Sequence, residues 1–178
     1  MSFNKLESSN CLFLICPTDH IEIILRQTCS TNAFFYTALG ANFRWDIDTQ
    51  KNLITLIENQ KVAQIVFVTK YTNMFYKEIL EPEIEPFFHV SETFLQLDKT
   101  LPDYLLNQSH PILRTMLLAS RHLQTQQKYM LETAILGKVL KHNEVTTQSF
   151  VYHPNNQIFY PPKIIENKVL SHGQISLN

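Results

Sequence analysis

Three side chains that could do chemistry lie close together near the start of the chain: Cys16, Asp19 and His20. They follow the apolar run LFLIC (12–16), which is typical of a strand buried on both faces. A cysteine thiolate can act as a nucleophile or a metal ligand, and a nearby carboxylate and imidazole could hold or transfer a proton. The segment CPTDHIE is therefore a candidate metal or nucleophile site. In the plainer interpretation, Cys16 is a small buried hydrophobe, Asp19 caps the next helix and His20 is exposed.

The elements that would position these residues alternate between strands and helices. Buried or aromatic runs predict strands over 12–16, 32–40 and 63–70, and apolar residues at helical spacing predict helices over 19–29 and 48–60. We expect Asp19 to cap the first helix, Asp48 or Thr49 to cap the second, and Gly40 to end the second strand. Such alternation predicts a mostly parallel sheet flanked by helices.

The second half of the chain reads as helices followed by a hairpin. A helix start after residue 71 is broken by Pro82 and Pro86, which predicts a loop over 81–90. From 101 to 143 the pattern is helical, with Pro111 at a helix start and either two helices or one bent helix. Aromatic segments around Pro154-Asn155-Asn156 predict an antiparallel hairpin within 144–162. We expect one α/β domain over 1–178, with a short N-terminal arm (1–11) and a C-terminal tail (163–178).

Composition excludes several classes of function. The net charge of −1 gives no general attraction to nucleic acid or to an anionic membrane, and no apolar stretch approaches the length of a membrane span. The three cysteines, Cys11, Cys16 and Cys29, form no C-x-x-C pair, and no secretory signal precedes them, so we expect a reducing compartment, by default the cytoplasm. The three glycines are too scattered for dinucleotide loops, P-loops or nucleophile elbows.

Two further polar residues follow the third predicted strand. Lys70 ends it and Asn73 comes three residues later. Since ligands of open parallel sheets bind at the carboxyl ends of the strands, we expect Lys70 and Asn73 to converge with Cys16, Asp19 and His20 on one cleft for a small molecule or anion. The alternative for Lys70 is a solvated side chain at a strand-to-helix turn. Aromatic residues between 34 and 45 are expected to pack in the core or at an interface.

The order and punctuation of these elements resemble the β-class carbonic anhydrases. In that family the first strand ends in C-x-D-S-R, the second in a turn like RNAGN and the third in G-H-x-x-C-G, and a strand and hairpin close the domain. Here FLICPTDHIE, AFFYTALGANF and IVFVTKYTNMF match the three motifs in turn, and LETAILGKVLKHNEVTTQSFVYHPNNQIFY matches the closing segment. The similarity covers about residues 12–160 and rests on pattern and order more than on identities.

The resemblance implies that most of a zinc site has been lost. The family's first ligand falls on Cys16, but its histidine falls on Lys70 and its second cysteine on Asn73, neither of which suits Zn²⁺. The family's Asp–Arg dyad falls on Thr18 and His20, and Asp19 stands one residue too late. We therefore expect no zinc and no zinc-dependent CO₂ hydration, although His89 could in principle help to rebuild a metal site.

Three functions stay open. The first is a carbonic-anhydrase-like pseudoenzyme, a binding or regulatory module with a cleft for a small anion or small molecule. The second is an enzyme of other chemistry that uses Cys16 with His20 or Lys70. The third is a structural or interaction protein. The family forms dimers, so the resemblance implies a possible homodimer.

Overall fold

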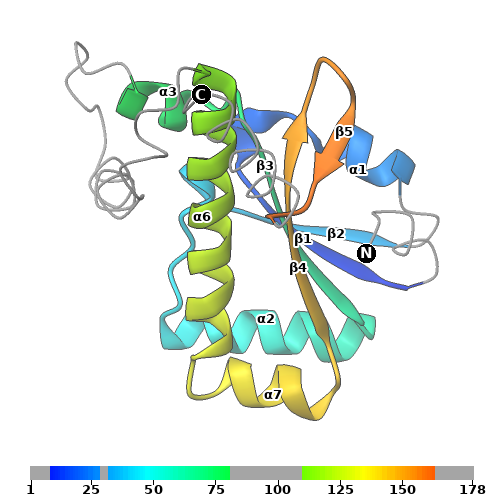
Figure 1. The fold of residues 1–178 in the computed structure, drawn as a ribbon. Coiled ribbons are helices and arrows are strands. Elements are labelled where there is room, and N and C mark those ends of the chain that lie inside the picture. Colours follow the sequence, from blue (N-terminus) through cyan, green and yellow to red (C-terminus); the bar gives the residue numbers. More distant parts are fainter. Residues whose placement is uncertain (1–8, 29–31, 81–109, 163–178) are drawn as a thin grey trace. The chain divides into compact units, whose positions relative to one another are not determined.

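The computed structural model describes residues 9–28, 32–80 and 110–162 (Figure 1). The predicted loop at 81–90, the helix start at 101, the C-terminal tail, most of the N-terminal arm, Cys29 and His89 lie outside these ranges. No helix within them is both long and apolar enough to cross a membrane. The elements are, in chain order, β1 (Cys11–Ile15), the 3-10 helix η2 (Pro17–Asp19), α1 (Glu22–Thr28), β2 (Ala33–Thr37), the 3-10 helix η3 (Leu39–Ala41), α2 (Ile47–Gln60), β3 (Gln64–Lys70), α3 (Met74–Leu80), α6 (Pro111–Leu131), α7 (Leu136–His142), β4 (Thr146–His153) and β5 (Ile158–Tyr160).

The strands form a five-stranded sheet in the order β2-β1-β3-β4-β5, which confirms the mostly parallel α/β sheet expected from the sequence. β1 pairs in parallel with both neighbours, so that Ile15 lies opposite Thr37 of β2 and Val68 of β3. The carboxyl ends of these three strands therefore lie at the same edge. β4 and β5 pair antiparallel, with His153 opposite Ile158, and this is the predicted hairpin.

By the density of its contacts the chain divides into two compact units. The first contains residues 1–68 and 125–149, and the second contains 69–124 and 150–178. The boundary passes through β3, α6 and β4. The expectation of one domain over the whole chain stays a prediction, and the two units are described in turn.

The first unit is built around β1, whose five residues are all fully buried. This explains why the run LFLI is continuously apolar rather than alternating, since both faces of the strand are covered. Phe43 lies 4% exposed among the rings of Tyr36, Trp45 and Phe67, at centroid distances of 5.8 Å from each. Of the aromatic residues after β2, Phe43 thus belongs to the core, as expected, and Trp45 is half-buried beside it. Helices α2 and α7 lie side by side (Figure 1).

One predicted helix cap was wrong. Helix α2 begins one residue earlier than expected, and its N-cap is Asp46, whose carboxylate accepts a 2.8 Å hydrogen bond from the Thr49 amide. Asp19 ends η2, three residues before α1 begins at Glu22, and its role as the cap of α1 stays a prediction. The start of α2 carries several side chains able to cap a helix, so only the path of the backbone decides which one does so.

The second unit contains the end of β3, α3, most of α6 and the hairpin. The single long helical pattern resolves into two helices, α6 and α7, and Pro111 starts α6 as predicted. In the hairpin the rings of Tyr152 and Phe159 lie 4.7 Å apart between centroids.

Candidate functional site

Cys16 is the residue that follows β1, and its side chain is fully buried. Two groups from the first unit surround its sulfur. The Gly40 amide donates a hydrogen bond to Sγ at 3.1 Å, and the Thr18 hydroxyl lies 3.0 Å from it. Cys16 is thus not just an apolar filler of the core, because its sulfur takes part in defined polar contacts.

Gly40 reaches the sulfur because of its backbone conformation. It has φ = 62° within η3, in the left-handed region that glycine adopts without a Cβ clash. The turn is fixed further by the Ala38 amide, which donates to the carbonyl of Ile15 at 3.1 Å. The glycine that was expected only to end the strand therefore also places an N–H group against Cys16.

The segment after η3 is held in place by a buried glutamine of α6. Gln126 is 2% exposed; its Oε1 accepts from the Phe43 amide at 3.1 Å, and its Nε2 donates to Asn42 Oδ1 at 3.1 Å. A second glutamine, Gln50, accepts from the Leu136 amide at the start of α7 at 3.3 Å. These carboxamides connect segments more than 80 residues apart in the sequence.

The two polar residues after Thr18 have opposite environments. Asp19 is 2% exposed, whereas His20 is exposed and has φ = 50°. The His20 amide donates to the carbonyl of Pro17 at 3.4 Å, which closes η2. The exposed His20 agrees with the plainer interpretation of this residue, but the burial of Asp19 does not follow from a role at a helix start.

Lys70 and Asn73 belong to the second unit. Asn73 is 3% exposed, and its Oδ1 accepts from the Phe75 amide at 3.0 Å, so that it caps α3. Its amide donates to the carbonyl of Lys70 at 3.2 Å. Lys70 is half-buried at the end of β3. The convergence of these residues with Cys16, Thr18, Asp19 and His20 on one cleft stays a prediction.

The described residues contain no group of three or more His, Cys, Asp or Glu side chains that could hold a metal ion. His89, the residue that could have completed a rebuilt site, lies outside the described ranges. Both cysteines within those ranges, Cys11 and Cys16, are buried free thiols.

A polar pair that sequence reasoning passed over lies in the second unit. Tyr76 of α3 and His122 of α6 are both fully buried, and the Tyr76 hydroxyl lies 3.1 Å from His122 Nδ1. Burial lowers the pKa of His122 to about 3, because the charged imidazolium would be desolvated. The only signal in the sequence was the position of His122 one helical turn after Leu118, on an apolar face of α6.

Comparison with known proteins finds the likeness in three dimensions rather than in sequence. No family model and no curated protein matches the chain. Solved structures do match: a mutant form of the β-carbonic anhydrase CafD of Aspergillus fumigatus has a TM-score of 0.72 at 15% identity, over 90% of this chain and 96% of that one. CafA of the same fungus has a TM-score of 0.72 at 10% identity, over 93% and 83% of the two chains.

One of the tetrameric β-carbonic anhydrases of Sordaria macrospora has a TM-score of 0.71 at 11% identity, over 89% of this chain and 83% of that one. Identities this low establish the fold and do not transfer the chemistry. The agreement in fold confirms the architecture that the three strand-end motifs implied. The chain has the β-carbonic anhydrase fold.

Proposed function

We propose that this protein is a carbonic-anhydrase-like pseudoenzyme, without zinc-dependent CO₂ hydration, whose strand-end cleft binds a small anion or other small molecule. The observation that carries the proposal is the role of Asn73. At the position where the resemblance places the second cysteine ligand, the side-chain oxygen of Asn73 is engaged by the Phe75 amide as a helix cap. A carboxamide oxygen is a poor ligand for Zn²⁺, and this one already has a structural partner.

The remaining positions support the same conclusion. Lys70 stands where the resemblance places the ligating histidine, and an ammonium group offers no lone pair to a metal. Cys16 remains as a single ligand of the preferred type, and one such ligand cannot build a tetrahedral site. The residues present therefore do not fit the family's zinc, and we derive no reaction step through it.

An anion suits the groups that remain. Lys70 contributes a positive charge at the end of β3. Ammonium groups are common partners of small anions, and ligands of open parallel sheets bind at the carboxyl ends of the strands. A cleft that keeps these groups would bind or sense an anion without converting it, as expected of a regulatory module. The two buried free thiols fit the reducing compartment inferred from the sequence, with the cytoplasm as the proposed location.

The zinc content of untagged protein tests the first half of the proposal. We expect far less than one zinc per chain by elemental analysis, and CO₂ hydration in stopped flow no faster than buffer. The double variant Lys70→His with Asn73→Cys is the informative control, because it restores the family's ligand types. It should acquire zinc, and the further change Cys16→Ala should remove it. Stoichiometric zinc in the wild-type protein would refute the proposal.

Anion binding needs a separate measurement. Bicarbonate or phosphate should raise the thermal midpoint of the wild-type protein, since a ligand at 100 times its Kd stabilises by about 2.7 kcal/mol. Lys70→Ala should abolish the shift, whereas Lys61→Ala, which removes an exposed lysine at the end of α2, should not. Equal shifts in both variants would mean that the anion acts elsewhere or through ionic strength.

The alternative of an enzyme that uses Cys16 as a nucleophile ranks second. A nucleophile must be reached by its substrate, and Cys16 is fully buried. We expect iodoacetamide to modify Cys16 in the native protein no faster than the protein unfolds globally. Rapid alkylation at neutral pH would favour the enzyme over the pseudoenzyme. An interaction protein without a functional cleft is favoured instead if the triple alanine variant of Cys16, His20 and Lys70 keeps the biological phenotype.

A further inference from the structure

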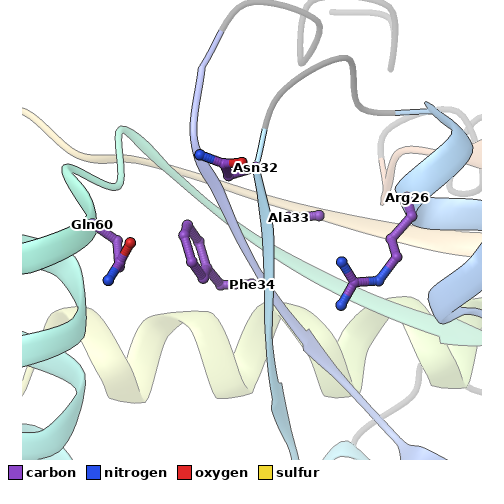
Figure 2. Close-up of a pocket in the computed structure, with 5 residues that line it drawn as sticks. All are labelled: Arg26, Asn32, Ala33, Phe34 and Gln60. Atoms are coloured by element: carbon purple, nitrogen blue, oxygen red, sulfur yellow. The ribbon is translucent and has the colours of Figure 1, made fainter.

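A hollow of about 390 Å³ lies at the ends of two helices in the first unit, within the usual size range of binding pockets. Its lining consists of Ile57, Glu58, Lys61, Val62, Ala63 and Asn143. A larger hollow, of about 530 Å³, lies at the start of β2. Figure 2 shows Arg26 on one side of that strand and Phe34 with Gln60 on the other, so a small molecule there would contact only one of these walls. The smaller hollow is therefore the stronger candidate for a small-molecule site.

Helices α2 and α7 run in the same direction, and both end beside this hollow (Figure 1). The Leu136 amide at the start of α7 donates to Gln50 in the first turn of α2. Beyond the two helix ends, the Thr146 amide donates to the carbonyl of Ala63 at 3.0 Å. The hollow thus lies beside the start of β3, whereas Lys70 ends that strand. It is a different place from the strand-end cleft proposed above.

The floor of the hollow is apolar and its walls are polar. Ile57 and Val62 are only 2% and 4% exposed, and the Val62 amide donates to the Ile57 carbonyl at 3.0 Å, which fixes the turn after α2. Glu58, Lys61 and Asn143 are exposed. An apolar floor beneath a few polar side chains suits a small molecule with an aliphatic body and one polar end.

Glu58 places a negative charge where the helix disfavours one. It lies in the last turn of α2, which contains no basic residue, although the carbonyl end of a helix favours cations. Within the described ranges its carboxylate forms no hydrogen bond and no salt bridge, not even with Lys61 three residues later. A bound cation would relieve this arrangement, because it would pair with the carboxylate and with the negative end of the helix at once.

Asn143, at the end of α7, adds a second acceptor. Its amide donates to the carbonyl of Val139 at 2.9 Å, and its side chain has no hydrogen-bond partner in the part of the chain that the structure describes. An ammonium group has three donors and suits a carboxylate together with a carboxamide oxygen. We propose that this hollow binds a small primary amine with an aliphatic body. The ammonium group donates to Glu58 and Asn143, and the aliphatic body covers Ile57 and Val62.

An anion is the less suitable ligand. It would meet the Glu58 carboxylate and the negative end of α2, both of which repel it. Lys61 is the basic residue of the lining, but it is exposed, and a lysine stem can carry its ammonium group into water. Lys61 therefore opposes the binding of an amine without preventing it, and its removal should have the opposite effect from the removal of Glu58.

Titration of the whole protein with isopentylamine near neutral pH tests the proposal, with two-dimensional amide NMR spectra as the measurement. Saturable shift changes should centre on the amides of Val62, Ala63 and Asn143. Isopentanol, which has the same shape without the charge, should bind about tenfold more weakly, because the charge-assisted hydrogen bonds are lost.

Three exchanges of charge on or beside α2 separate the site from general attraction of amines. Glu58→Gln should weaken amine binding about tenfold and also raise the thermal midpoint of the unliganded protein, because it relieves the unfavourable charge at the helix end. Lys61→Gln should strengthen binding. Asp48→Asn is the matched control for Glu58→Gln: it removes the same charge from an exposed position in the first turn of α2, outside the hollow, and should leave binding unchanged.

A variant of shape completes the test. Ala63→Leu enlarges an exposed side chain of the lining and should weaken amine binding although Glu58 is intact. If this variant does not fold, the charge exchanges at exposed positions supply the result. Absence of saturable shifts in the wild-type protein, or equal binding by wild type and Glu58→Gln, would overturn the proposal. So would tighter binding of isovalerate than of isopentylamine, because the hollow would then select an anion through Lys61.

Discussion

The buried His122 makes stability fall on acidification. In the folded protein its pKa is lowered to about 3, whereas the ordinary value is 6.5. Between these values the unfolded chain binds a proton that the folded chain excludes, so the free energy of unfolding decreases as the pH falls below 6.5. The contribution of neutral His122 to the free energy of unfolding is fully present above the pKa of the unfolded chain. From about pH 7.5 to about pH 5 the free energy of unfolding decreases by about 2 kcal/mol.

Other groups also titrate in this range, so the assay compares two proteins. His122→Gln keeps a hydrogen-bonding side chain beside Tyr76 and removes the titration. Urea denaturation of both proteins at several pH values should give curves that separate by about 2 kcal/mol between neutral pH and pH 5, with the wild type losing more. A histidine NMR titration should also find His122 neutral in the folded state at pH 5. Parallel stability curves, or a native His122 that titrates near 6.5, would refute the reasoning.

The remaining predictions concern stability and use urea denaturation. Gly137→Ala should destabilise by about 1–3 kcal/mol, because a Cβ at this position in α7 would meet the backbone carbonyl of Leu131, which has no room to move; a neutral result would show that the junction of α6 and α7 relaxes. Asn73→Ala should cost about 1 kcal/mol through loss of the cap on α3, and Asn73→Asp should restore it; equal losses in both variants would argue against a capping role. Gln126→Ala should lower the free energy of unfolding by about 1–3 kcal/mol, because the buried Phe43 amide loses its acceptor. A loss of stability no larger than that of a substitution at an exposed position would contradict the role of Gln126 in holding the segment after η3 in place.

Local pattern was sufficient for most elements. Three patterns reflect side-chain burial at regular spacing along the chain: the continuous apolar run of β1, the β-branched run of β3, and the spacing of Leu53 and Ile57. They can therefore be recognised without knowledge of the fold. The hairpin followed from the turn residues between two aromatic segments. Even the likeness to β-carbonic anhydrases was visible in the punctuation at the strand ends, although overall identity to the solved structures is only 10–15%.

Local pattern did not predict which of several neighbouring polar residues caps a helix or is buried. Asp46, Asp48 and Thr49 are all able to cap α2, and the backbone conformation at Asp46 decides the outcome. Asp19 was expected at a helix start and lies buried in η2. Asn73 was interpreted as a cleft residue and as a replaced ligand, and the cap that its side chain provides for α3 was not predicted. The energies that separate such alternatives are small and depend on the local path of the chain.

What the sequence alone determined is the order and type of the elements, because these depend on residues close together in the chain. Only the tertiary structure decided the environment of each functional side chain. The Gly40 amide meets the Cys16 sulfur across 24 residues, the Tyr76 hydroxyl meets His122 across 46, and Gln126 meets the Phe43 amide across 83. Each contact depends on two segments brought together by packing, and no pattern within either segment encodes the other.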